Sequence, residues 1–151
     1  HLETMPTHMP DAFEAGTLNL PGIIGLNEGL SYIESVGMKN IHNHELTLTK
    51  TFLEGLRSIT GINIIGKQDI QDRTAVVSIT IDGMDPASIA YELESTYHIM
   101  TRVGLHCAPR AHQTLGTYPE GTVRFSFGYA NTLEEVDMAL SALHTILKNT
   151  K

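Results

Sequence analysis

The feature that most constrains the fold is a stretch of strict alternation at residues 75–81. Apolar side chains occupy every second position, and polar ones such as Ser78 and Thr80 lie between most of them. A period of two places successive side chains on opposite faces of a strand, so this stretch predicts a strand that buries one face. A second strand is predicted at residues 122–127, with Val123, Phe125 and Phe127 on one face and Arg124 and Ser126 on the other.

Shorter strands are predicted at residues 62–65 and 99–103, and four other stretches have helical periodicity. Three of these helices carry start signals, namely an N-cap followed by proline at Asn19 and Asp85, and a capping box at Thr132–Glu135. The helices are predicted from about residue 20 to 36, 40 to 60, 86 to 97 and 133 to 147. This order of elements predicts an α+β fold in which helices cover a small, mainly antiparallel sheet.

The first predicted helix has an apolar face and a face of small residues. Its glycines are Gly22, Gly25 and Gly29. Each interior glycine costs about 1 kcal/mol of helix propensity, so the stripe suggests the close approach of a partner. Residues 1–20 are broken by prolines and are predicted to be an extended lead-in that contacts another domain or a second subunit. Residues 21–151 are predicted to form one domain.

The composition excludes several classes of protein. At 151 residues and 41% hydrophobic content, the chain is expected to bury an adequate core. A formal net charge of -7 argues against binding to nucleic acid, which needs clustered Lys and Arg. The sequence has no apolar run of the roughly 18 residues that span a membrane, and no signal peptide is visible. Since one cysteine cannot form an internal disulfide, a reducing, cytoplasmic location is expected.

The single cysteine, Cys107, lies in the segment with the densest cluster of cationic groups. His106 precedes it, and the others nearby are Arg102, Arg110, His112 and Arg124. Cationic neighbours favour the thiolate, the reactive form of cysteine. The segment is predicted to be a loop between strands, where chemistry is often placed. Two interpretations follow, a reactive thiol or a small buried hydrophobe.

Two groups of side chains could be considered as metal ligands. Met5, His8 and Met9 are soft ligands in the lead-in, but a loop that packs onto another domain explains the methionines equally well. His42 and His44 lie two residues apart, so they point to different faces of the predicted helix and make a poor chelate. No metal site is therefore predicted.

Two separated blocks of the sequence resemble one known family. Residues 102–109 read Arg-Val-Gly-Leu-His-Cys-Ala-Pro, and Gly-Thr-Val-Arg-Phe-Ser at 121–126 and Tyr-Ala-Asn-Thr-Leu-Glu-Glu-Val-Asp at 129–137 follow. The other block, residues 13–26, reads Phe-Glu-Ala-Gly-Thr-Leu-Asn-Leu-Pro-Gly-Ile-Ile-Gly-Leu. Together these blocks are similar to the C-terminal small domain of class V aminotransferase-like enzymes, most of all the cysteine desulfurases and selenocysteine lyases.

The resemblance implies a pyridoxal phosphate enzyme of which this chain is the last part. The family's lysine, which forms the Schiff base with the cofactor, belongs to a large N-terminal domain that the sequence lacks. The chain alone is therefore expected to be inactive. The resemblance also implies a homodimer, in which Gly16 and Thr17 reach the cofactor phosphate of the neighbouring subunit.

The resemblance further implies roles for the residues around the thiol. Cys107 would be the catalytic nucleophile of the parent enzyme, and Arg124 would hold the α-carboxylate of the amino-acid substrate. Arg102 and His106 would contribute to substrate binding. The Cys107 thiolate would attack the sulfur of L-cysteine and leave a persulfide and alanine, so that a sulfur-acceptor protein would be a further partner.

Other interpretations stay open. The parent could be a class V aminotransferase or selenocysteine lyase in which Cys107 is incidental, or the chain could be a freestanding dimerisation or binding module. From the residues alone, Arg124 could equally be a solvent-facing or structural arginine, and Gly16–Thr17 a turn before a helix. Leu105 and residues 110–116 depart from the family pattern, which leaves the substrate open between cysteine, selenocysteine and another amino acid.

Overall fold

The structure is a computed structural model that describes residue 4, residues 6–14 and residues 16–149. The chain divides into two compact units, His1–Met38 and Lys39–Lys151, and each is described by itself. The division falls after the first long helix, whereas the sequence analysis put the domain boundary at residue 20, before that helix.

The first unit contains a short 3-10 helix, η1 (Asp11–Phe13), and the helix α1 (Leu20–Val36). The start of α1 is as predicted, because the Asn19 side chain accepts a hydrogen bond of 3.1 Å from the Gly22 N–H. The predicted end is also confirmed, since Gly37 follows the helix with a φ of 87°. The lead-in is not extended throughout, because η1 interrupts it.

Most residues of helix α1 are exposed, and none of them is buried. Its large apolar side chains are open to solvent, for example Leu26 at 65% and Ile24 at 62% exposure. A Cβ placed on Gly25 or Gly29 would have no heavy atom within 4 Å. The close approach that these glycines predict is therefore not made within the first unit.

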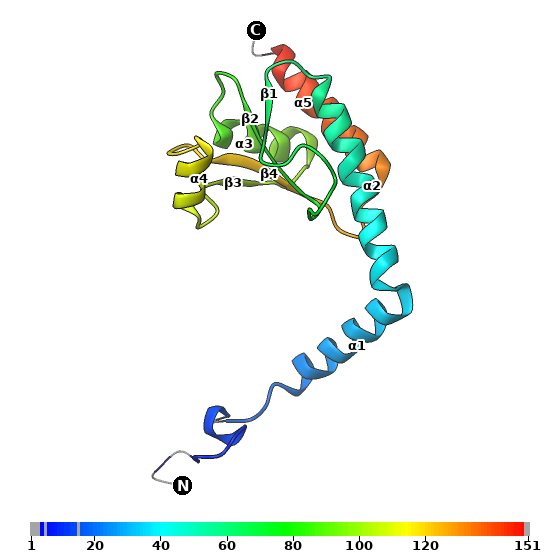
Figure 1. Cartoon of the computed structure of the whole chain (residues 1–151), viewed down its shortest axis with the longest axis vertical. Helices are drawn as coiled ribbons and strands as arrows, with labels where there is room; N and C mark the ends of the chain where they lie inside the picture. The colour runs from blue at the N-terminus through cyan, green and yellow to red at the C-terminus, as the bar shows by residue number, and fades with distance from the viewer. Residues whose placement is uncertain (1–3, 5, 15, 150–151) are drawn as a thin grey trace. The chain divides into compact units, whose positions relative to one another are not determined.

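The second unit is an α+β fold, as predicted. Its four strands form one antiparallel sheet in the order β1-β2-β4-β3 (Figure 1). Its elements are α2 (Met38–Arg57), β1 (Ile62–Ile65), β2 (Val76–Ile81), α3 (Pro86–Tyr97), β3 (Arg102–Gly104), α4 (Pro109–Leu115), β4 (Thr122–Ser126) and α5 (Leu133–Asn149). No helix of the described residues is long and apolar enough to cross a membrane.

The alternation in β2 and β4 places one hydrophobic core on one face of the sheet. Val77, Ile79 and Val123 are fully buried there. They pack in one cluster with α2, α3 and α5, through Leu48, Phe52, Leu53, Leu56, Ile89, Leu93, Val136, Ala139, Ala142, Leu143 and Ile146. Since successive strand residues face opposite ways, Ser78 and Arg124 lie on the other face. The three long helices thus leave a polar face of the sheet for other contacts.

The predicted strand at residues 99–103 is wrong in its start, because β3 begins only at Arg102. The cause is the end of α3, where His98 adopts a left-handed conformation and the Ile99 N–H donates to the Leu93 carbonyl. Ile99 therefore belongs to a helix cap instead of the strand ladder.

Helix α4 was not predicted, because the sequence analysis assigned its residues to a loop. The helix begins at Pro109 and ends before Gly116, whose φ is 73°. Proline at the start and glycine after the end are the usual boundary residues of a helix. With seven residues, α4 is too short to show a periodic pattern.

The apolar face of α5 differs from the predicted stripe in part. Leu133, the first residue of the predicted stripe, is 44% exposed, and Val136 and Leu143 are fully buried. The predicted capping box is confirmed, because the Thr132 N–H donates to Glu135 Oε2 at 3.0 Å and the Glu135 N–H donates to Thr132 Oγ1 at 3.3 Å.

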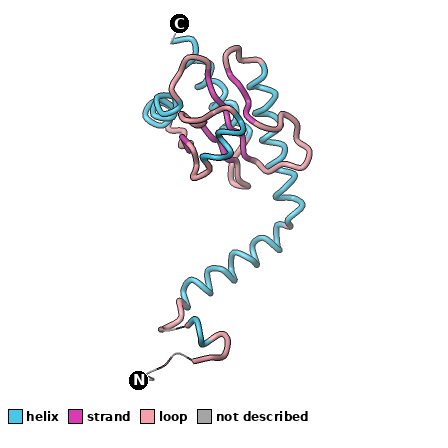
Figure 2. The backbone as a smooth tube through the Cα atoms, turned by 60° about the vertical axis from the view of Figure 1, so that its left-hand side comes forward, coloured by secondary structure: helices cyan, strands magenta, loops and turns pink. Residues whose placement is uncertain are grey.

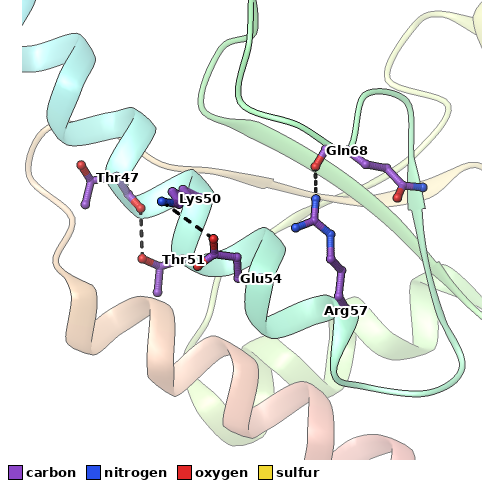
Figure 3. A network of polar contacts seen from close by, with 6 residues as sticks. All are labelled: Thr47, Lys50, Thr51, Glu54, Arg57 and Gln68. Carbon is purple, nitrogen blue, oxygen red and sulfur yellow. Dashed lines mark hydrogen bonds and ion pairs between the residues drawn. The ribbon is translucent and has the colours of Figure 1, made fainter.

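Side chains hold the loop between β1 and β2 in place without regular secondary structure. The Arg57 guanidinium of α2 donates to the Gln68 carbonyl, on the helix face that also carries the Lys50–Glu54 pair (Figure 3). Arg73 donates to the carbonyl oxygens of Lys67 and Val76 at 2.7 and 2.6 Å. Figure 2 shows this long loop next to the sheet. These bonds supply partners for backbone carbonyls that no strand pairs.

The core predicts a large effect for Phe52→Ala. The Phe52 ring is fully buried and lies 4.8 Å from the Phe125 ring and 5.1 Å from the Phe127 ring, centroid to centroid. Truncation should lower the free energy of unfolding by about 3–5 kcal/mol, measured by urea denaturation. Tyr91→Ala, at a ring that is 75% exposed on α3, should change it by less than about 0.5 kcal/mol. Equal effects of the two substitutions would contradict this core.

Candidate functional site

Cys107 lies at the tip of a tight turn between β3 and α4 and is exposed to solvent. The Ala108 N–H donates to the Leu105 carbonyl at 2.8 Å, and the two residues between them, His106 and Cys107, have φ values of 50° and 60°. Positive φ at both central positions is the pattern of a type I′ turn, which usually holds Gly, Asn or Asp. Each non-glycine residue in this region costs about 1–3 kcal/mol, and such strain is concentrated at functional sites.

The His106 ring fastens the turn to β3 by a hydrogen bond of 3.0 Å between its Nε2 and the Arg102 carbonyl. Because a carbonyl only accepts, Nε2 carries the proton of the neutral ring and Nδ1 is left as an acceptor. Burial lowers the pKa of His106, the hydrogen bond to Arg102 raises it, and the charges of Arg124, His112 and Arg102 lower it. The net effect is a lowered pKa, so His106 is neutral at pH 7.

The backbones of β3 and the residue before β4 approach each other closely at Gly104 and Gly121. Gly121 has a φ of 83°, and a Cβ at this position would lie 2.2 Å from the Gly104 carbonyl carbon. No side chain fits in that space. Gly104 also has a positive φ, 95°, but a Cβ there would meet nothing within 4 Å. Only Gly121 is therefore required for the close approach of the two strands.

Arg102 and Arg124 are direct partners across the β3–β4 ladder, and Ser78 of β2 is the partner of Arg124 on the other side. Side chains that pair in this way have Cβ atoms about 4.5–5.5 Å apart. The three residues form a row on the sheet face opposite the core. A row of two guanidinium groups and one hydroxyl provides several hydrogen-bond donors for an anion.

No carboxylate in the described part of the chain neutralises these arginines. The two ion pairs among the described residues are His8–Asp11 and Lys50–Glu54, and neither involves a residue of the row. Like charges in direct cross-strand contact are destabilising. The Arg124 Nε is also buried without a hydrogen-bond partner, which costs about 1–3 kcal/mol for an unpaired polar group. An anion bound at this row would relieve both costs.

His112 has a structural position that the sequence did not reveal, because its spacing from Thr117 follows no regular pattern. It is 6% exposed, and its Nδ1 lies 2.7 Å from Thr117 Oγ1. The Thr117 carbonyl accepts from the Gly121 N–H at 2.7 Å. This chain of bonds joins α4 to the start of β4, and the His112 ring lies 5.7 Å from the His106 ring. Ser78 was also missed, since alternation identified its face but not its partner.

The remaining predicted site residues, Gly16 and Thr17, lie in the first unit. Both are exposed, and a Cβ on Gly16 would have nothing within 4 Å, so a phosphate has free access to the backbone there.

The other four predicted site residues come together in the second unit. Cys107, His106, Arg102 and Arg124 all lie on β3, β4 or the turn after β3.

The described residues contain no group of three or more His, Cys, Asp or Glu side chains that could hold a metal ion. Of the soft ligands in the lead-in, Met5 lies outside the described residues, and His8 pairs with Asp11 at 2.6 Å. His44 bonds through Nε2 to the Asn131 carbonyl at 2.9 Å, and His42 is exposed.

Comparison with known proteins gives one consistent family. Residues 3–139 match the family model for aminotransferase class-V. The chain is 38% identical over 138 residues to a probable cysteine desulfurase of Methanothermobacter thermautotrophicus, covering 91% of this chain and 34% of that protein. It is 37% identical over 145 residues to a probable cysteine desulfurase of Pyrococcus abyssi, covering 96% and 35%.

Solved structures agree with this family. The apo structure of a cysteine desulfurase from Thermococcus onnurineus superposes with a TM-score of 0.85 at 38% identity, covering 93% of this chain and 34% of that one. The cysteine desulfurase CsdA of Escherichia coli, in an S-sulfonic acid form, gives 0.80 at 27% identity, covering 92% and 33%. The chain thus spans about one third of the length of these relatives.

The close approach of the two strands predicts unequal effects of two glycine substitutions. Gly104→Ala should cost about 1–2 kcal/mol, the strain of a left-handed alanine. Gly121→Ala carries the same backbone strain and adds about 1–3 kcal/mol of overpacking against the Gly104 backbone. Urea denaturation measures both. If Gly104→Ala proved the more harmful, the strand contact described here would be incorrect.

The charges near His106 predict its titration. Its pKa should lie below the ordinary value of 6.5 and should rise toward it in Arg124→Gln, because that substitution removes a positive charge. Arg110→Gln should leave it unchanged, since Arg110 is not among the charges that act on His106. The imidazole proton shifts in an NMR pH titration give these values.

The same lowered pKa should make the fold less stable in acid. The unfolded chain binds a proton at His106 more readily than the folded chain, so the free energy of unfolding should fall as the pH drops through 6.5. A His106 resonance that titrates at or above 6.5 would contradict both expectations.

Proposed function

Because this chain belongs to the class V aminotransferase family, we propose that it is the small-domain part of a pyridoxal phosphate-dependent cysteine desulfurase. The chain spans about a third of the relatives, so the activity is proposed for a longer protein that contains it. In that protein, L-cysteine would be converted to alanine and the sulfur retained as a persulfide on Cys107.

The observation that carries this proposal is an exposed thiol on a strained turn beside two arginines that have no carboxylate partner among the described residues. The turn holds Cys107 at the end of β3, and Arg102 lies at the start of the same three-residue strand. An amino-acid substrate brings one carboxylate to the arginines and one sulfur atom to the thiol. Cys107 is exposed and can act as a nucleophile, so its presence favours desulfurase chemistry over simple transamination.

Arg124 is proposed to hold the α-carboxylate of the substrate. Its guanidinium can form two parallel hydrogen bonds to a carboxylate, and its unpaired Nε is available as one of the donors. Arg102 lies opposite and would hold the same carboxylate or stabilise the charge of the thiolate. His106, neutral at pH 7, would orient the turn through its bond to the Arg102 carbonyl and leave Nδ1 free to accept a proton.

The sulfur transfer that these residues support is a displacement at sulfur. The Cys107 thiolate attacks the sulfur of bound cysteine, a sulfur–sulfur bond forms, and the carbon–sulfur bond of the substrate breaks. Pyridoxal phosphate, when bound, supplies the electron sink that takes up the electron pair of the broken bond. Protonation of that carbon completes alanine. The persulfide on exposed Cys107 can then be passed to the thiol of an acceptor protein.

The residues present fit one edge of the cofactor site. Gly16 and Thr17 offer an exposed backbone and a hydroxyl, which suit the phosphate group. The described lysines, Lys39, Lys50, Lys67 and Lys148, lie on α2, α5 or the loop after β1, and none lies on β3, β4 or the segment between them. We propose that the lysine that binds the cofactor belongs to a large domain outside this chain, and that this chain alone is inactive.

The exposure of α1 supports a proposal about assembly. A helix with no buried residue and many exposed apolar side chains needs a neighbour to cover it. The large domain or the second subunit of a homodimer is proposed to be that neighbour, with Gly25 and Gly29 at the contact. A cytoplasmic location is proposed as well, because a working thiol must stay reduced.

The intact mass of a longer protein that contains this chain tests the function. After incubation with pyridoxal phosphate and L-cysteine, the protein should gain one sulfur atom that a thiol reductant removes. Cys107→Ala should abolish both the adduct and alanine release. If no adduct forms and alanine release is unchanged in Cys107→Ala, the persulfide mechanism is wrong. A class V enzyme with an incidental cysteine would then be the better description.

A further inference from the structure

A shallow groove runs between the end of α3 and one face of α5, and Cys107 is not among its lining residues. One hollow of about 450 Å³ lies over α5, and a second of about 410 Å³ lies toward β4. The two hollows share Tyr97, Ile99 and Met138 as lining residues, so they adjoin each other and together make up the groove. We name it the α3–α5 groove and define it by Tyr97, Ile99, Met100, Glu134, Asp137 and Met138. It takes no part in the chemistry described above.

The groove has the dimensions of a short helix. Its wall on α5 extends from Glu134 to Thr145, through residues at helical spacing. Eleven residues of helix rise about 16 Å, which is three turns. A bound helix of three to four turns would therefore lie along α5 for its whole contact length, with its apolar side chains over Ile99 and Met138.

The floor of the groove is apolar and adaptable. Ile99 and Ala142 lie in it, and two methionines flank it with large exposed fractions, 85% for Met100 and 58% for Met138. Methionine side chains are flexible and polarisable, and they are over-represented at surfaces that bind varied apolar partners. Two exposed methionines beside one groove are therefore typical of a binding surface.

The charge of the groove indicates which kind of partner it would bind. Glu134, Glu135 and Asp137 line it, and none of its lining residues is Lys or Arg. Glu135 Oε2 already accepts hydrogen bonds from Asn131 and Thr132, so Glu134 and Asp137 carry most of the charge argument. The chain as a whole carries a formal charge of -7. An acidic partner would be repelled, and a neutral apolar segment would leave the carboxylates without counter-charges. Charge complementarity therefore favours a helix with apolar residues on one face and Lys or Arg at its edge.

We infer that the α3–α5 groove is a docking site for a basic amphipathic helix of a partner protein. The inference rests on the groove and not on the proposed function. Met100 lies seven residues before Cys107, a path of at most about 25 Å along extended chain. A partner docked there is therefore held within reach of the thiol turn.

A fluorescein-labelled 14-residue helix of leucine, alanine and lysine, with leucines on one face, tests the inference. Its binding to the 151-residue chain is followed by fluorescence polarisation. Met138→Ser and Asp137→Lys should each weaken binding roughly tenfold, as expected for contacts at the centre of an interface. The matched controls are Tyr91→Ser, which removes a large and even more exposed side chain from α3, and Glu54→Lys, which makes the same charge change on α2.

The controls separate specific docking from general attraction between opposite charges. The inference holds if Tyr91→Ser and Glu54→Lys bind within twofold of the parent chain. It also requires that a scrambled peptide of the same composition binds roughly tenfold more weakly. Equal effects of Asp137→Lys and Glu54→Lys would overturn it, because the attraction would then be nonspecific. Loss of binding in a longer protein that contains this chain would also overturn it, since the groove would then be an internal contact.

Discussion

The close contact between Gly121 and Gly104 is the constraint on which the rest of the site depends. It sets β4 against β3 with room for no side chain between them. The contact aligns Arg124 with Arg102 across the ladder, and the turn that carries Cys107 begins at the next residue. The bonds from Gly121 through Thr117 to His112 then hold α4 on the far side of the thiol. Two strands, one turn and one short helix thus act as a single support for four functional side chains.

The division of the sheet into two faces separates stability from chemistry. The core on one face is built from long apolar side chains of β2, β4 and three helices, and it uses none of the residues assigned to the site. The other face carries two arginines and a serine in a row. Because strand residues alternate, a single substitution on the polar face leaves the packing on the core face intact. The arginines can therefore remain unpaired without a large loss of core stability.

The sequence predicted the fold to a large extent and the site in part. Alternation identified β2 and β4 and their inner faces, and cap residues located the starts of α1, α3 and α5. The predictions for the shorter elements were wrong for physical reasons. Ile99 belongs to the end of α3, and α4 has too few residues to show a periodic pattern. The site residues came from a resemblance of local sequence. Register, which pairs Arg124 with Ser78, and the His112–Thr117 bond depend on contacts between distant segments that no local pattern encodes.

The exposure of α1 has a consequence for how cooperatively the chain unfolds. Within the described part of the chain, the fully buried large side chains all belong to residues 48–146, and α1 contributes none. In the isolated chain, the amide protons of α1 should exchange with solvent through local fraying, independently of the sheet. If a neighbour covered α1, the same amide protons would exchange only when that contact opened, so their exchange would be slower. The exchange rate of one helix would then report how tightly the domain is held by its partner.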